Sequence, residues 1–248
     1  MSRHQPKYVA EAGVLGSPLL YDWSKDIELK LYAAKDQNVK LCQALDGSNY
    51  RAKYSIGIAI TEWIIWQFEK HARLDDAHSR IEAAWASAID PAYAGDLKFK
   101  LTRTSVFNET AKIDGPMKLA LNFLGSIDAH YATGNIYLAA AVVKQVVLAR
   151  HVIAEREVLE QWISSTLRQC AQVFPRQVDY DTTTQKYDAS HELPVPREFF
   201  EPGFTYTPET GKAVLLEFLK TLDYTKNPYL RSPEEMKENG FQGTPYLL

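Results

Sequence analysis

The sequence contains little cysteine: only Cys42 and Cys170 occur in its 248 residues. Two cysteines cannot form the disulfide framework of a small secreted domain. Both lie on apolar faces of predicted helices, which indicates reduced and buried thiols that do not react. A chain of this length can bury a large hydrophobic core without covalent cross-links.

The sequence also lacks a strong charge and a long apolar run. Its formal net charge is -3, which gives no overall attraction to DNA or to an anionic membrane. Polar residues interrupt its most apolar stretches, whereas a membrane-spanning helix needs about 20 apolar residues in succession. The N-terminal residues contain no apolar segment of signal-peptide length. We therefore expect a cytoplasmic protein that contacts neither DNA nor a membrane.

Signatures of catalysis and cofactor binding are equally scarce. There is no Gly-x-Ser-x-Gly motif, and Gly211-Lys212 lacks the preceding glycine spacing of a phosphate-binding loop. A di-metal site needs carboxylates from several buried helices. The two most apolar segments supply only Glu62, which we expect on a polar face with Glu69 and Arg73. We predict no cofactor and no metal, although His and carboxylate residues lie close in three places: Asp75/His78, Asp128/His130 and His151/Glu155.

What the sequence does contain is organised around one stretch, Tyr50 to Phe68. Its middle is apolar at almost every position, so no single helix face holds all of its apolar residues. A helix of this kind is usually buried on most sides. We expect a central helix that continues to about Arg73. A second stretch of the same character, from Asn135 to Arg150, is expected to pack beside it.

Capping residues and apolar stripes predict helices in most of the remaining chain. The expected segments are 24–45, 75–89, 116–134, one that ends at 174, 207–222 and 232–240. Leu97, Phe99 and Leu101 alternate with polar residues in segment 92–115, where a connector, a small hairpin and a helix all stay open.

The sequence as a whole predicts an all-α fold in one domain, 1–248. We expect about seven or eight helices in an irregular orthogonal bundle around the two central helices. Residues 1–23 are expected to form an irregular N-terminal arm, anchored by Tyr21 and Trp23.

Two segments are rich in proline and aromatic residues, and the second contains only the short helix expected at 232–240. We name residues 175–207 the strap and residues 223–248 the tail, or C-terminal extension. Exposed aromatic residues often dominate protein–protein interfaces. The side chains that we expect at such a contact surface are Phe199, Phe200, Phe204, Tyr206, Tyr229, Phe241, Tyr246 and Leu247. The alternative is that strap and tail fold back and cover the core of the chain itself.

One short motif suggests chemistry. Four residues separate Arg73 from His78, and this spacing resembles the Arg-x4-His signature of HEPN ribonucleases. In that family the Arg and His of two protomers meet at a dimer interface and cleave RNA, with the 2′-hydroxyl as nucleophile. The resemblance covers only these six residues, and Leu74 stands where a polar residue is usual. The alternative is that Arg73 pairs with Glu69 while His78 lies on the surface of the next helix.

Because a convincing catalytic set is missing, we predict a non-enzymatic protein-binding role. The protein would act as an adaptor, a chaperone-like partner or a toxin-neutralising immunity protein. Its strap and tail would contact another protein or a second copy of the chain. The alternative hypothesis is a metal-independent, dimeric ribonuclease that acts on RNA through Arg73 and His78.

Overall fold

The computed structural model describes residues 5–33, 38–99, 111–177, 181, 183–184 and 186–247. The fold is all-α, as the sequence predicts, and within these residues β-pairing is limited to isolated bridges. The described helices are α1 (Lys7–Ala10), α2 (Lys25–Tyr32), α3 (Val39–Asp46), α4 (Tyr50–Gln67), α5 (Asp75–Ile89), η2 (Pro91–Tyr93), α6 (Ala111–Ala132), α7 (Leu138–Val152), α8 (Arg156–Val173), η3 (Arg197–Phe200), α9 (Pro208–Thr221) and α10 (Pro233–Glu238).

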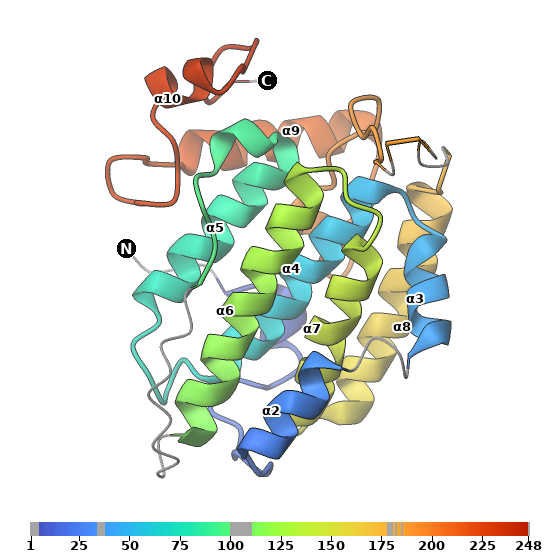
Figure 1. Cartoon of the computed structure of the whole chain (residues 1–248), viewed down its shortest axis with the longest axis vertical. Coiled ribbons are helices and arrows are strands. Elements are labelled where there is room, and N and C mark those ends of the chain that lie inside the picture. The colour runs from blue at the N-terminus through green and yellow to red at the C-terminus, as the bar shows by residue number, and fades with distance from the viewer. Residues whose placement is uncertain are drawn as a thin grey trace.

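Helix α4 lies at the centre of the molecule and contacts α5, α6 and α7 (Figure 1). Every residue of α4 except Arg51 is buried. The side chain of Asn49 caps the helix by accepting a hydrogen bond from the Ala52 N–H at 2.9 Å. The predicted pair of central helices is confirmed, because α7 is buried along most of its length and packs directly on α4.

The central helix is shorter than predicted. It ends at Gln67 instead of near Arg73, and the chain turns over Phe68 to Ala72. Phe68 is fully buried, whereas Lys70 and His71 are exposed. The turn thus keeps the last apolar residue of the stretch inside, while the polar residues that follow reach solvent.

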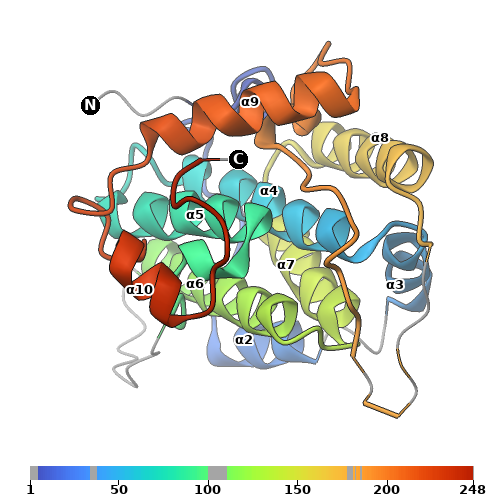
Figure 2. The same ribbon diagram turned by 90° about the horizontal axis from the view of Figure 1, so that it is seen from above.

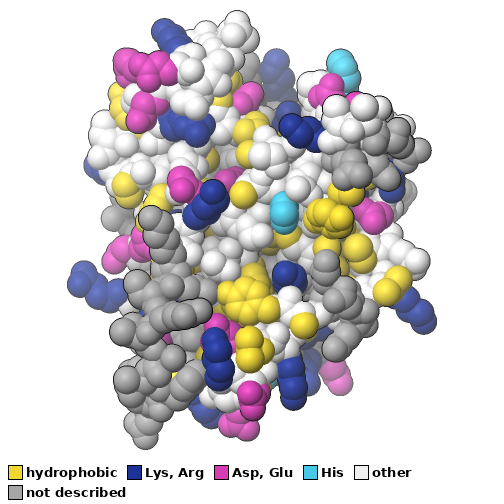
Figure 3. Space-filling view, in the orientation of Figure 1, with side chains coloured by type: hydrophobic (Ala, Val, Ile, Leu, Met, Phe, Trp, Pro, Cys, Tyr) yellow, Lys and Arg dark blue, Asp and Glu magenta, His cyan; other side chains and the backbone are white. Residues whose placement is uncertain are grey.

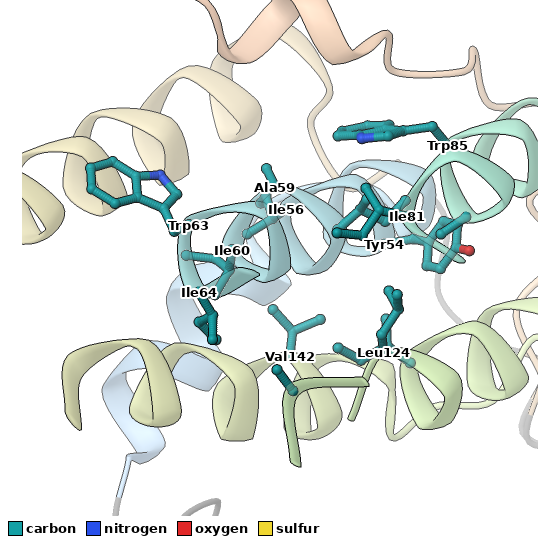
Figure 4. Close-up of a cluster of buried hydrophobic side chains, with 14 of the residues drawn as sticks. Tyr54, Ile56, Ala59, Ile60, Trp63, Ile64, Ile81, Trp85, Leu124 and Val142 are labelled. Carbon is teal, nitrogen blue, oxygen red and sulfur yellow. The ribbon is translucent and has the colours of Figure 1, made fainter. Parts of the chain in front are cut away.

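Small and polar residues fix how α4 meets its neighbours. At Gly57 a β-carbon would lie 3.1–3.2 Å from Ile127 of α6 and Val142 of α7, so glycine permits a close approach. Gln145 of α7 donates a 2.7 Å hydrogen bond to the hydroxyl of Thr61. Figure 4 shows Val142 and Leu124 facing α4 on one side and Trp85 of α5 on another. Buried polar side chains therefore connect α4 to α7 inside an otherwise apolar core.

The helices form layers, which Figure 2 shows from above. Helix α9 covers one side of α4 and α5, while α6 and α7 cover the opposite side and α2 lies outside them. Helices α3 and α8 lie along one edge of these layers. Buried hydrophobic residues from Tyr8 to Met236 belong to a single contiguous core. None of the helices in the described ranges is long and apolar enough to cross a bilayer.

The prediction of one helix over residues 24–45 is wrong. The structure places two helices there, α2 and α3, and residues 34–37 between them lie outside the described residues. Helix α2 packs on α7 and reaches α6, where Tyr32 donates a 3.1 Å hydrogen bond to Asn122. Helix α3 packs on α7 and α8 instead. One straight helix has a single apolar stripe, so it could not face both α6 and α8.

Helix α6 begins earlier than its proline suggests. Pro116 was expected at the first helical position, but it lies inside a helix that starts at Ala111. Proline has no N–H to donate to the carbonyl of Lys112, one turn earlier. The hydroxyl of Tyr21 donates to that carbonyl instead. Trp23 packs so closely on Gly115 that a β-carbon there would lie 2.0 Å from its indole nitrogen. The N-terminal arm is therefore anchored on α6.

Segment 92–115 begins within a 3-10 turn, η2, continues as extended chain that carries the buried side chain of Leu97, and ends with the first residues of α6, which starts at Ala111. In its described residues it pairs with the tail through an antiparallel bridge between Ala94 and Leu230. Leu101, and with it the end of the alternating pattern, lies outside the described residues. Of the interpretations that the sequence left open, an extended connector fits residues 94–99, and a helix fits residues 111–115.

A glycine in α6 offers a test of this packing. Replacing a helical glycine by alanine usually stabilises a helix by about 1 kcal/mol. At Gly125, however, the new β-carbon would lie 2.7 Å from the Leu97 carbonyl oxygen and 2.9 Å from the Lys98 Cα. We expect Gly125→Ala to lower the free energy of unfolding in urea by about 1–3 kcal/mol. The adjacent, exposed Ser126→Ala is the control and should change it by less than about 0.5 kcal/mol. A more stable Gly125→Ala protein would contradict the packing.

Candidate functional site

The strap is fastened to the central helix by a buried ion pair. The guanidinium Nη2 of Arg197, on η3, lies 2.6 Å from a carboxylate oxygen of Glu62, on α4. The hydroxyl of Tyr8 donates to the other oxygen of Glu62. Glu62 was predicted to lie on a polar face, and this is wrong, because its side chain is only 2% exposed. A carboxylate at such a depth needs both a counter-ion and hydrogen bonds, and strap and arm supply them.

The burial of this cluster changes the acidity of its members. Burial raises the pKa of the Tyr8 hydroxyl well above its usual value, and the nearby charge of Glu62 raises it further. Burial by itself would lower the pKa of the Arg197 guanidinium, but the adjacent carboxylate of Glu62 raises that pKa overall. Arg197 therefore stays cationic and Tyr8 stays a neutral hydrogen-bond donor.

A second carboxylate of the strap holds the N-terminal arm. The side chain of Glu201 accepts a 3.2 Å hydrogen bond from the backbone N–H of Tyr8, at the start of α1. Burial raises the pKa of this carboxyl, and the backbone N–H groups of Lys7 and Tyr8 partly oppose the shift. Arm, strap and central helix thus meet at one point.

An open pocket of about 330 Å³ lies where the arm meets the strap. We call it the strap pocket. Its lining residues are Lys7, Arg197, Glu198, Glu201, Pro202, Gly203 and Phe204. Gly203 adopts a φ of +77°, which a residue with a side chain rarely adopts, and its turn carries Pro202 and Phe204 to the pocket wall. The pocket combines fixed charges with one aromatic ring.

The strap is also fixed nearer its middle, at Glu192. The carboxylate of Glu192 accepts hydrogen bonds from the backbone N–H groups of Tyr50 and Arg51, at 3.1 and 2.8 Å. These donors belong to the first turn of α4, where a negative charge is favourable. Arg51 in turn donates to the carbonyl of Ala189. The strap therefore caps the helix that it crosses.

The aromatic residues predicted for a contact surface divide by burial. Phe199 and Phe200 are buried in the core, where Phe199 meets Phe174 and Phe200 meets Trp85 and Trp162. The other predicted aromatic residues are half-buried, namely Phe204, Tyr206, Tyr229, Phe241 and Tyr246. Leu247 is 53% exposed. Much of the strap and the tail therefore covers the chain's own core.

The tail is held on α5 and η2 by both backbone and side chains. Tyr229 donates to Asp76, and the Arg80 guanidinium lies 4.2 Å from the centre of its ring. Tyr93 of η2 makes edge contacts with Phe241 and Tyr246, both at 5.3 Å between ring centres. Met236 of α10 is fully buried. The exposed part of the tail includes Tyr224 as well as Leu247.

The two residues of the ribonuclease motif lie in different environments. His78 is buried, and its Nε2 lies 2.9 Å from the Glu69 carboxylate, beside the ring of Trp66. Arg73 is exposed in the turn between α4 and α5. The expectations that His78 lies on the surface and that Glu69 pairs with Arg73 are therefore wrong, because Glu69 faces His78. Catalysis by a dimer through these residues stays a prediction.

The structure reveals a further polar cluster that the sequence did not indicate. The Asp128 carboxylate accepts hydrogen bonds from Tyr54 at 2.6 Å and Ser87 at 2.9 Å. Burial raises the pKa of Asp128, and these two hydrogen bonds oppose the shift. Since the three residues lie on three different helices, no local motif could predict them. The cluster joins α4, α5 and α6 across the core.

Among the residues that the structure describes, those suited to metal binding or thiol chemistry lie apart from one another. Across the described ranges, no three His, Cys, Asp or Glu side chains are grouped to hold a metal ion. The Nε2 atom of His151 lies 2.8 Å from the Asp22 carbonyl oxygen. The carboxylate of Glu155 accepts a hydrogen bond from the Ser17 hydroxyl. Cys170 is buried, and its burial raises the pKa of the thiol. Cys42 is half-buried, so it is less enclosed than predicted.

The sequence reasoning missed Tyr8, Glu62, Arg197 and Glu201. One signal for Glu62 was present, because it is the single carboxylate inside an otherwise apolar helix, and such a residue is rarely buried unless it is paired. Nothing in the sequence identified its partners, Tyr8 and Arg197, which are 54 and 135 residues away along the chain. No protein-family model, no curated protein and no solved structure matches this chain. The geometry of strap, tail and strap pocket is therefore the basis on which a function can be proposed.

Proposed function

We propose that the protein is a cytoplasmic, non-enzymatic binding protein, of the adaptor, chaperone-like or immunity type, that contacts another protein. Strap and tail supply the contact surface through the parts that their own packing leaves exposed. The observation that carries this proposal is the strap itself: its buried residues hold it rigidly, while it presents an open pocket and the exposed Leu193. A surface that is fixed before contact loses little conformational entropy on binding.

On the face that Figure 3 shows, the distribution of charge favours a protein partner over a nucleic acid. In Figure 3, acidic and basic side chains are interspersed on the visible face, and no broad basic patch covers the residues drawn in colour. Nucleic-acid binding needs clustered Lys and Arg side chains that neutralise phosphates. Mixed charge with scattered apolar side chains is typical of the rim and core of protein interfaces.

The test compares two triple variants that each remove three exposed apolar side chains. The first replaces Leu193, Tyr224 and Leu247 of strap and tail by serine, and the control replaces Leu20, Leu29 and Val39. All six side chains are at least 40% exposed, so both variants should keep the melting temperature of the wild type. We expect cross-linked complexes, with another protein or with a second copy, to be lost only in the strap and tail variant. Equal complexes in both variants, or none in the wild type, would contradict the proposal.

A further inference from the structure

Four tyrosine rings are stacked between the core and the strap, and we call them the tyrosine stack. The rings of Tyr54 and Tyr131 are nearly parallel, with planes 5° apart and 4.0 Å between their centres. Tyr50 follows at 5.8 Å from Tyr131, and Tyr187 of the strap lies 5.0 Å from Tyr50. Tyr54, Tyr131 and Tyr50 are buried, whereas Tyr187 is half-buried. Electrons pass readily between aromatic rings that are nearly in contact, so the stack forms a path from the surface to the core.

The inner end of the stack has a base. The hydroxyl of Tyr54 donates a 2.6 Å hydrogen bond to the carboxylate of Asp128. A second hydroxyl, from Ser87, donates to the same carboxylate at 2.9 Å, and both hydrogen bonds favour its ionised form. A tyrosine that loses an electron becomes a strong acid, and a base within hydrogen-bond reach can accept its proton. Oxidation of Tyr54 can therefore proceed with transfer of its proton to Asp128.

The middle rings of the stack have weaker proton acceptors. Tyr50 donates to the backbone carbonyls of His130 and Asn135, at 2.6 and 3.0 Å. Tyr131 donates to the carbonyl of Ala88 at 3.5 Å. A backbone carbonyl is a much weaker base than a carboxylate, so it does not hold the proton of an oxidised phenol. Oxidation of these two rings is transient and passes on to the ring that can lose its proton.

The outer ring is surrounded by positive charge. The Nζ atom of Lys53 lies 5.2 Å from the centre of the Tyr187 ring, and the guanidinium carbon of Arg176 lies 5.8 Å from it. Neighbouring cations disfavour a further positive charge on this ring. An electron removed from Tyr187 is therefore replaced from within the stack.

We propose that the tyrosine stack accepts a single oxidising equivalent at Tyr187 and holds it as a neutral radical on Tyr54. The co-reactant is a small one-electron oxidant, which removes an electron from Tyr187 and is itself reduced. Electrons then move outward from Tyr54 through Tyr131 and Tyr50. The O–H bond of Tyr54 breaks, and its proton passes to Asp128. One electron thus leaves the protein and one proton moves inside it. This activity does not depend on the proposed binding role.

The experiment supplies the oxidant to the full-length protein in solution. Pulse radiolysis of dilute azide generates azide radicals, each of which takes one electron and becomes an azide ion. Tyrosyl radicals are followed by optical absorption and, after rapid freezing, by electron paramagnetic resonance. We expect a long-lived tyrosyl signal in the wild type and its loss in Tyr54→Phe, which keeps the ring but has no phenolic proton. A wild type without a long-lived signal, or an unchanged signal in Tyr54→Phe, would overturn the proposal.

Two further variants separate the path from a simple effect of burial. Tyr131→Phe keeps the packing but interrupts the stack, and it should also lose the long-lived signal. Tyr93→Phe removes the hydroxyl of a buried tyrosine outside the stack and should leave the signal unchanged. Equal signals in the wild type and Tyr131→Phe would show that the oxidation does not pass along the stack. Melting curves of each variant verify that it is folded.

The role of the base has its own test. Asp128→Asn retains the shape of the side chain but removes the base, so the lifetime of any tyrosyl radical should fall at least about 10-fold. An unchanged lifetime would contradict proton transfer to Asp128. If this variant does not fold, the wild type in D2O replaces it. Decay of the radical should then be slower than in H2O, because the return of the electron requires the return of the proton, and equal decay in the two solvents would count against the proposal.

Discussion

Replacing Arg197 by methionine is expected to lower the free energy of unfolding by about 3–5 kcal/mol, because it leaves the buried Glu62 carboxylate without a counter-ion. Methionine retains most of the side-chain volume, so the loss reflects charge more than packing. Tyr8 still donates to Glu62, but one neutral hydrogen bond does not offset the desolvation of a carboxylate. Urea denaturation followed by circular dichroism measures the change.

Two further proteins complete this test. Adding Glu62→Gln to Arg197→Met removes the unpaired charge and should recover about 1–2 kcal/mol of the loss. Arg156→Met, at the exposed start of α8, removes an arginine without a buried partner and should cost less than about 0.5 kcal/mol. A loss below about 1 kcal/mol for Arg197→Met would show that water reaches the pair and screens it.

The second large effect is expected from a chain that ends at Asp223 and so lacks most of the tail. It loses Leu230 and Met236, which are buried, and it removes the rings of Phe241 and Tyr246 that pack on buried Tyr93. Burial of each large apolar side chain contributes roughly 1.5–3 kcal/mol. The sum is a large part of the about 5–15 kcal/mol that stabilises a typical domain. We expect loss of the cooperative thermal transition and of the near-ultraviolet circular dichroism signal.

A shorter truncation is the control for the tail. A chain that ends at Tyr246 keeps the contacts of Tyr93 with Phe241 and Tyr246 and should melt within a few degrees of the full protein. If the chain that ends at Asp223 instead melts like the full protein, the tail does not stabilise the core. Loss of partner binding in that truncated chain would otherwise reflect unfolding, which is why surface variants test the contact surface better.

The sequence predicted the centre of the fold because that centre is encoded locally. The apolar residues of α4 surround the helix, and such a pattern is compatible only with burial on most sides. The same reasoning predicted α7. The prediction failed at residues 24–45, where the apolar stripe is divided between two helices, α2 and α3. The stripe itself does not specify which neighbouring helices each half packs on.

The candidate site was less predictable than the fold. Phe204 and the strap were identified as a contact region from composition, but the pocket beside them requires Lys7, which is distant in sequence. Phe199 and Phe200 have the same composition signal as Phe204, yet they are buried. Whether an aromatic residue of a long segment packs inward or outward depends on the surface that it crosses.

By itself the sequence determined that this chain forms helices, which two of them lie at the centre, and that strap and tail differ in character from the rest. Only the tertiary structure decided that Glu62 lies buried between Tyr8 and Arg197, and that the strap stabilises the core while it presents a pocket. The physical reason is the distance along the chain over which each kind of interaction acts. Helical periodicity and capping depend on residues within about one turn of each other. The neutralisation of a buried charge depends on groups that meet only after the whole chain has packed.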